Sequence, residues 1–258
     1  EYSTNNTGQS FHTVKDERVE VVDLESDIVV YHPADHRLLL CDSLQKKDRF
    51  ETSPAFSPDG RTLYFCSAEA KKIPEEYKEI RYNLCSIDFD PSAGTFGSRI
   101  DTLVNAEALG KSVSFPRPSY DGKYIMFTLS DYGNFSIGHK EANLWLLDLS
   151  SGDLRELSEV NSDDTESFHN WSSNSRWFVF SSRRGDGLYT RLYLASMDEN
   201  GKISKPFLLP KEDPETYYDR SVYSYNVPDF VNAPILLDTK VFEKRITSKE
   251  RIQVQVGN

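Results

Sequence analysis

The residues best suited to chemistry lie in two polar segments, and the first runs from residue 131 to residue 141. This segment combines a phenol, an imidazole, an ammonium group and two carboxylates. A His beside a carboxylate can move protons or bind a polar ligand, and long loops on a rigid scaffold often carry such sites. The alternative is a solvated loop that packs against its own scaffold. The candidate ligand- or partner-binding residues here are Asp131, Tyr132, His139, Lys140 and Glu141.

The second polar segment places two adjacent arginines in an otherwise acidic chain. A guanidinium group can bind a carboxylate or a phosphate through two parallel hydrogen bonds. On a strand the two arginines would point to opposite faces, so we expect only one of them to enter a shared site. The alternative is salt bridging to Asp186 or to nearby acids. The candidate binding residues here are Arg183, Arg184, Asp186, Tyr189 and Arg191.

Standard signatures of catalysis and metal binding do not occur in the sequence. It has no G-x-S-x-G elbow, Walker loop, G-x-G-x-x-G, H-E-x-x-H or EF-hand loop. The five His residues are scattered along the chain, so we predict no metal site, no cofactor and no assigned catalytic residue. These observations favour a non-enzyme without deciding the question.

Charge and hydropathy exclude two further classes of protein. The 41 acidic residues outnumber the 30 basic ones and give a net charge of −11, which argues against a nucleic-acid surface. No run of about 18 apolar residues occurs, so no transmembrane helix is expected. The aromatic content of 12% is too high for a disordered chain and suits β structure.

A degenerate repeat predicts the elements that position these side chains. Residues 54–67 read PAFSPDGRTLYFCS, residues 116–130 read PRPSYDGKYIMFTLS, and residues 169–182 read HNWSSNSRWFVFSS. Each copy is a strand, a tight turn and a second strand, because Asp-Gly or Asn-Ser supplies the positive φ that a short turn needs. Two further strands follow each hairpin. Four antiparallel strands in about 40–50 residues are typical of a propeller blade.

We therefore predict an all-β fold, a β-propeller of four-stranded antiparallel blades that forms a single domain over residues 1–258. Clear blades are expected at about 52–105, 113–158 and 167–210, and a degenerate copy at about 28–45. Residues 211–258 are expected to form divergent strands or a tail. Either this is a compact propeller of four or five units, or the chain is a segment of a longer propeller with further blades or domains.

The repeat also assigns roles to side chains outside the two polar segments. Trp171 takes the place of Phe56 and is expected in the core between blades. His169 shares its face and is either a candidate binding residue that lines the channel or a satisfied interior histidine. The alternation at Tyr223, Tyr225 and Val227 is interpreted as strand packing, with an exposed contact surface as the alternative.

The repeat resembles that of TolB-like β-propellers, whose signature runs Pro-x-Trp/Phe-Ser-Pro-Asp-Gly-Lys-x-Ile-x-Phe-x-Ser. The resemblance covers roughly residues 30–210, and the longer stretches at 129–142 and 181–191 are similar to TolB-like proteins of Bacteroidetes envelopes. The resemblance implies an exported, periplasmic or envelope-associated protein, with a lipoprotein as one option. It also implies that the chain binds a protein segment or small ligand through its funnel or loop face. The alternative is a hydrolase or lyase acting on glycans with His and carboxylate groups at the funnel mouth.

Overall fold

Four sheets of four strands build the chain in the computed structural model, which describes residues 2–10 and 20–257. Three sheets are antiparallel throughout, and each takes its four strands from one continuous stretch of sequence. Their strands are β4 (Arg49–Phe56), β5 (Thr62–Glu69), β6 (Asn83–Asp90) and β7 (Thr95–Val104); β8 (Ser112–Pro118), β9 (Tyr124–Ser130), β10 (Asn143–Asp148) and β11 (Leu154–Glu156); and β12 (Glu166–Trp171), β13 (Trp177–Ser182), β14 (Arg191–Ser196) and β15 (Phe207–Leu208).

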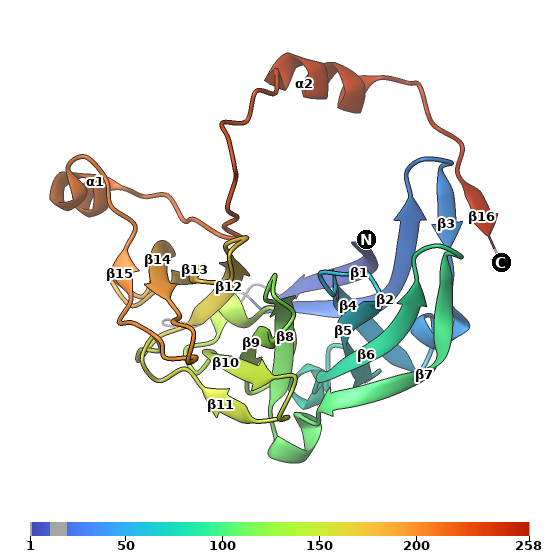
Figure 1. Cartoon of the computed structure of the whole chain (residues 1–258), viewed down its shortest axis with the longest axis horizontal. Helices are drawn as coiled ribbons and strands as arrows, with labels where there is room; N and C mark the ends of the chain where they lie inside the picture. The colour runs from blue at the N-terminus through green and yellow to red at the C-terminus, as the bar shows by residue number, and fades with distance from the viewer. Residues whose placement is uncertain (1, 11–19, 258) are drawn as a thin grey trace.

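The remaining sheet joins the two ends of the described chain. Its antiparallel strands are β1 (Tyr2–Ser10), β2 (Glu20–His32) and β3 (Arg37–Leu39), and β16 (Gln255–Gly257) pairs in parallel with β3. The sheets follow one another around an arc from β1–β3 to β12–β15, and the C-terminal segment crosses back towards β3 (Figure 1). The predicted β-propeller of four-stranded blades is confirmed.

The hairpin turn forms for the reason that its sequence predicts. The Ser57 hydroxyl donates to Asp59 Oδ1 at 2.6 Å and accepts the N–H of Thr62 at 2.9 Å, while Gly60 takes φ +72°. Ser172 and Asn174 make the same contacts in the third copy. In the degenerate copy His36 occupies the glycine position with φ +55°, which explains how that copy keeps its turn.

The core lies between the sheets and is built from repeated positions. Phe65, Phe127 and Phe180 are fully buried, and Trp171 packs with Phe178 and Met126 between the β8–β11 and β12–β15 sheets. The expected core role of Trp171 is confirmed. Its indole N–H also donates to the carbonyl of Arg117 at 3.1 Å, which ties the two inner strands together.

The C-terminal region, expected to form divergent strands or a tail, contains one strand, β16, among its described residues. Residues 211–254 contain two helices, α1 (Pro214–Arg220) and α2 (Thr239–Thr247), joined by extended chain. Tyr223 and Val227 are 69% and 62% exposed, so the interpretation of this alternation as core packing is wrong. Among the described residues, no helix is both long and apolar enough to span a membrane.

Candidate functional site

A cavity of about 700 Å³ lies between the inner strands β4, β8 and β12, and we call it the axial cavity. Its walls mix aromatic rings with a guanidinium, two amides and a carboxylate. The lining residues are Thr52, Ser53, Pro54, Ala55, Phe56, Pro58, Phe115, Arg117, Pro118, Tyr120, Asn134, Phe135, Asn170 and Asp229.

Equivalent positions of the repeat supply the polar part of this wall. Ala55, Arg117 and Asn170 each stand one residue before the end of an inner strand, so the fold brings them around one space. Asp229 joins them from the C-terminal segment and accepts a hydrogen bond from the Asn170 amide at 2.9 Å. The repeat thus fixes where these side chains point, while their chemistry changes from blade to blade.

Bulges in the inner strands shape the cavity wall. The pairing register shifts between Thr52 and Ala55 in β4, and at the equivalent places in β8 and β12. Within these bulges Ser53, Phe115 and Phe168 have φ of +54°, +53° and +46°. Positive φ is uncommon for residues other than glycine, and bulges re-aim side chains. The ring centroids of Phe115 and Phe168, which both lie in such bulges, are 4.7 Å apart.

The loop at 131–142 packs against the inner strands through the 3₁₀ helix Ser136–Gly138. The Ser136 hydroxyl contacts Ser114 Oγ at 3.1 Å and Ser167 Oγ at 2.9 Å, and these two serines are equivalent positions of β8 and β12. The hydroxyl of Thr165 donates to the Ser136 carbonyl at 3.0 Å. Asn134 and Phe135 therefore reach the cavity, whereas the candidate residues on either side of them do not line it.

His139 anchors this loop to strand β2. Its ring nitrogens lie 3.4 Å from Glu141 and 3.5 Å from Glu20, and the Tyr132 hydroxyl donates to Glu20 at 2.6 Å. Asp131 instead pairs with Lys111 at 2.5 Å.

Electrostatics hold this anchor in its charged form. Burial alone would lower the pKa of His139, but its two carboxylate partners raise it to about 9. Burial alone would raise the pKa of Glu141, and its contact with His139 lowers it to about 2. Burial and the bond to Glu20 raise the pKa of Tyr132. The cluster is thus a charged clasp between the loop and β2, and Lys140 beside it is exposed.

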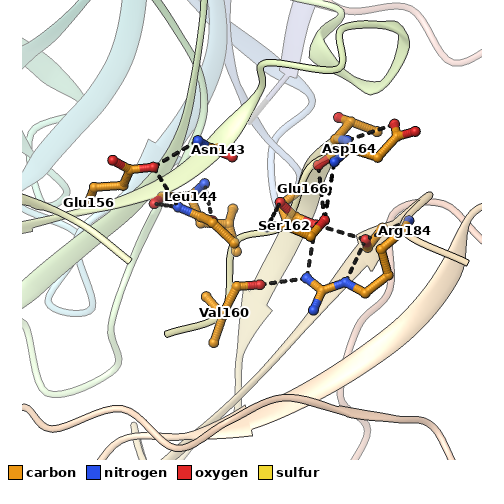
Figure 2. A network of polar contacts seen from close by, with 11 residues as sticks. Asn143, Leu144, Glu156, Val160, Ser162, Asp164, Glu166 and Arg184 are labelled. Carbon is orange, nitrogen blue, oxygen red and sulfur yellow. Dashed lines mark hydrogen bonds and ion pairs between the residues drawn. The ribbon is translucent and has the colours of Figure 1, made fainter. Parts of the chain in front are cut away.

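Arg184 belongs to a buried network at the start of β12 and the end of β13 (Figure 2). Its guanidinium lies 2.8 Å from Glu166 Oε1 and 4.5 Å from the Tyr193 ring centroid. Glu166 is fully buried and also accepts the hydroxyl protons of Ser162 at 2.6 Å and Ser182 at 2.8 Å. This arrangement matches the structural alternative for Arg184, a salt bridge within the fold.

Of the other residues of this segment, Arg191 holds the C-terminal segment, because its guanidinium donates to the carbonyl oxygens of Tyr223 and Ser221. Both arginines follow the end of β13, so the expected strand alternation of Arg183 and Arg184 does not apply. Arg191 is 5% exposed and lies 3.6 Å from Asp186 and 5.2 Å from the Tyr189 ring centroid. Arg183 is half-buried at the start of the same turn.

His169 sits in the interior. It is 2% exposed, and its Nε2 lies 2.9 Å from the carbonyl oxygen of Met126. Burial lowers its pKa to about 3, which keeps the ring neutral. His169 is therefore buried and does not line the axial cavity.

The axial wall is the part of the site that the sequence reasoning missed. Arg117, Asn170 and Asp229 were not among the candidates, because they carry no motif. The available signal was their shared place in the inner-strand pattern, one residue before Pro118, Trp171 and Phe230. Among the described residues, no group of three or more His, Cys, Asp or Glu side chains is placed to hold a metal ion.

The four four-stranded sheets, three of which border the axial cavity, define a β-propeller, which is the fold that the TolB-like repeat predicted.

Solved structures similar to the chain include TolB from Acinetobacter baumannii, with 18% identity over 72% of this chain and 36% of that one and a TM-score of 0.36. A putative TolB from Agrobacterium tumefaciens has 19% identity over 74% and 60%, with a TM-score of 0.44. An oligogalacturonate lyase in complex with manganese has 15% identity over 77% and 50%, with a TM-score of 0.45. The chain therefore spans between about a third and three fifths of the length of these proteins. No protein-family model and no curated protein sequence matches the chain.

Proposed function

We propose that the chain is a non-catalytic binding propeller that holds a protein segment or a small ligand in its axial cavity. The observation that carries this proposal is the cavity itself. Its volume of about 700 Å³ falls within the roughly 300–1,000 Å³ of ligand pockets. Aromatic walls supply apolar contact, and a few convergent polar groups supply orientation.

The wall chemistry suits a ligand with both apolar and polar groups. Phe56, Phe115 and Phe135 offer ring surfaces, while Arg117 and Asn170 offer hydrogen-bond donors. Tyr120 stands at the rim with 54% of its surface exposed, where it can close over a bound group.

The glycan-cleaving alternative needs two carboxyl groups about 5–10 Å apart across a pocket. Among the described residues that line the axial cavity, Asp229 is the one carboxylate. The His139 and Glu141 pair lies in the clasp to β2 instead, where its charges satisfy one another. These placements favour binding over acid–base catalysis.

The test is a selection of random heptapeptides and of a small-fragment set against the folded chain, followed by calorimetric titration of the hits. We expect Tyr120→Ala and Arg117→Ala each to weaken binding at least tenfold. Trp177→Ala is the matched control, since this aromatic residue is 41% exposed and does not line the cavity. Hits that bind both cavity variants as well as the wild type, or a selection without hits, would contradict the proposal.

We also propose that the protein works in the cell envelope, on the support of the TolB-like repeat. The decisive observation is the sequence of the full gene product. A secretion or lipoprotein signal, together with further blades, would support the assignment, and a gene product with neither would reject it.

A further inference from the structure

The C-terminal segment contains a further copy of the inner-strand pattern. The ends of β4, β8 and β12 read TSPAF, SFPRP and SFHNW, and residues 226–230 read NVPDF. The second residue of each copy has positive φ, and Val227 has φ +51° beside the +53° of Phe115. A β-branched residue rarely adopts this conformation, so its recurrence at the same place indicates the same kind of element.

The segment docks on its neighbouring sheet through the backbone bond that joins the other blades. In each case the donor is the residue just before the pattern, and the acceptor is the residue just before the third strand of the preceding blade. The three bonds are Val113 N–H to Tyr82 O at 2.9 Å, Glu166 N–H to Ala142 O at 2.9 Å, and Tyr225 N–H to Thr190 O at 3.1 Å. Residues 221–230 therefore occupy the place of a fifth inner strand.

Side chains of the β12–β15 sheet hold the same edge of this segment. Arg191 donates to the carbonyls of Tyr223 at 2.7 Å and Ser221 at 2.9 Å, and the Ser181 hydroxyl donates to the carbonyl of Tyr225 at 2.8 Å. All three acceptors are odd-numbered residues. Since successive residues of an extended chain direct their backbone groups to opposite edges, the even-numbered residues face away from the sheet.

That outer edge has no partner strand in the described part of the chain. In β8 the equivalent residues Ser112 and Ser114 pair with β9. Residues 222, 224 and 226 belong to none of the four sheets, and no backbone hydrogen bond joins them to another described residue. Val222 and Tyr223 are 67% and 69% exposed. An unpaired edge with exposed apolar side chains is a template for another strand.

The chain exposes more surface than a compact monomer of its mass would, and its exposed large apolar residues concentrate in the C-terminal segment. The chain exposes 15,232 Å², whereas a compact monomer of 29.6 kDa is expected to expose about 11,600 Å². The excess of about 3,600 Å² exceeds the roughly 1,000–2,500 Å² that each partner contributes to an obligate homodimer. The exposed large apolar residues of the C-terminal segment are Val222, Tyr223, Val227, Phe230, Val231, Ile235, Leu236, Leu237, Val241, Phe242, Ile246, Ile252, Val254 and Val256.

We propose that residues 221–230 are the inner strand of an incomplete fifth blade, and that their open edge pairs antiparallel with the same edge of a second copy of the chain. A twofold axis near Ser224 makes the pairing self-complementary. Val222 then lies opposite Asn226 of the second copy, and Tyr223 lies opposite Tyr225. Such cross-strand aromatic pairs stabilise antiparallel edges.

The test is sedimentation equilibrium of the whole chain between 1 and 100 μM, with Ser224→Pro compared with Ser224→Ala. Both substitutions remove the 3.4 Å contact between Thr190 N–H and the Ser224 hydroxyl, but only proline removes the N–H of the open edge. We expect a dimer whose Kd rises at least tenfold in Ser224→Pro and stays within twofold in Ser224→Ala. The amides of residues 222, 224 and 226, which face the open edge, should gain protection from hydrogen exchange as the concentration rises.

A second variant keeps the proposal testable if proline disturbs the fold. Val222→Lys places a charge on the exposed edge without altering the backbone, and we expect the same loss of dimer. A chain that stays monomeric at 100 μM would overturn the proposal. So would dimers that survive both Ser224→Pro and Val222→Lys, because their interface would then lie in another part of the exposed segment.

Discussion

Replacing Glu51 with glutamine should stabilise the protein above neutral pH. Glu51 is 1% exposed, and its nearest cation, the Arg49 guanidinium, is 4.0 Å away. Burial raises its pKa to about 7, and the charge of Asp27 adds to the increase, whereas Arg49 and the Ser67 hydroxyl oppose it. The equivalent residue of β12, Glu166, has an arginine at 2.8 Å, so the same buried carboxylate has a close ion-pair partner in that blade and none among the described residues of the blade of Glu51.

The size of the stabilisation follows from the difference in the pKa of Glu51 between the folded and the unfolded chain. A pKa of about 7 in the folded protein against 4.5 in the unfolded chain corresponds to about 3 kcal/mol, at 1.36 kcal/mol per pKa unit. The folded state holds the Glu51 proton more tightly than the unfolded chain does. The stabilising effect of protonated Glu51 is therefore complete below pH 4.5 and is lost as the pH rises to about 7. Glutamine keeps the shape of the protonated acid and removes that loss.

Urea unfolding of the wild type and of Glu51→Gln between pH 4 and pH 8 measures the effect. We expect the free energies of unfolding to agree near pH 4 and to differ by up to about 3 kcal/mol at pH 8, with the variant more stable. The control Glu107→Gln removes the same charge from an exposed position and should change little. A Glu51→Gln variant that is no more stable than the wild type at pH 8 would refute the reasoning.

The sheets were predictable from sequence because their signal is local. The turn needs a serine, an aspartate or asparagine and a residue that tolerates positive φ within five positions, and the apolar strands flank it directly. Even the copy with His36 at the glycine position keeps the frame. The buried Phe65, Phe127 and Phe180 follow from the same register.

The polar clusters were not predictable, because their partners lie far away in the sequence. His139 meets Glu20, and the amide of Asn134 donates to Asp23 at 2.5 Å across 111 positions. A residue-type search found His139 and Glu141 but could not show that β2 would neutralise them. In the structure these residues join the loop to β2.

The residues that line the axial cavity were not predictable for a different reason. Its members share a position in the repeat and differ in chemistry, so no composition or spacing marks Ala55, Arg117 and Asn170. The copy at 226–230 escaped because Phe230 is followed by Val-Asn-Ala in place of the Ser-x-Asp-Gly turn. Aligning the inner strands alone, without their turns, would have shown both.

Two further predictions concern the core and the clasp. Trp171→Ala should cost about 3–5 kcal/mol of unfolding free energy in urea, since it empties a fully buried site between two sheets; a loss below about 1 kcal/mol would contradict that packing. For the clasp, the pKa of His139 is raised from 6.5 to about 9, so its stabilising effect is complete below pH 6.5 and is lost as the pH rises to about 9. That difference corresponds to about 3 kcal/mol, which His139 shares with Glu20 and Glu141. His139→Gln should therefore be less stable than the wild type at pH 6.5 and lose less stability between pH 7 and pH 9, since Glu51 titrates in the same way in both proteins. If the wild type and His139→Gln lose stability equally over that range, the clasp is not held by the imidazolium charge.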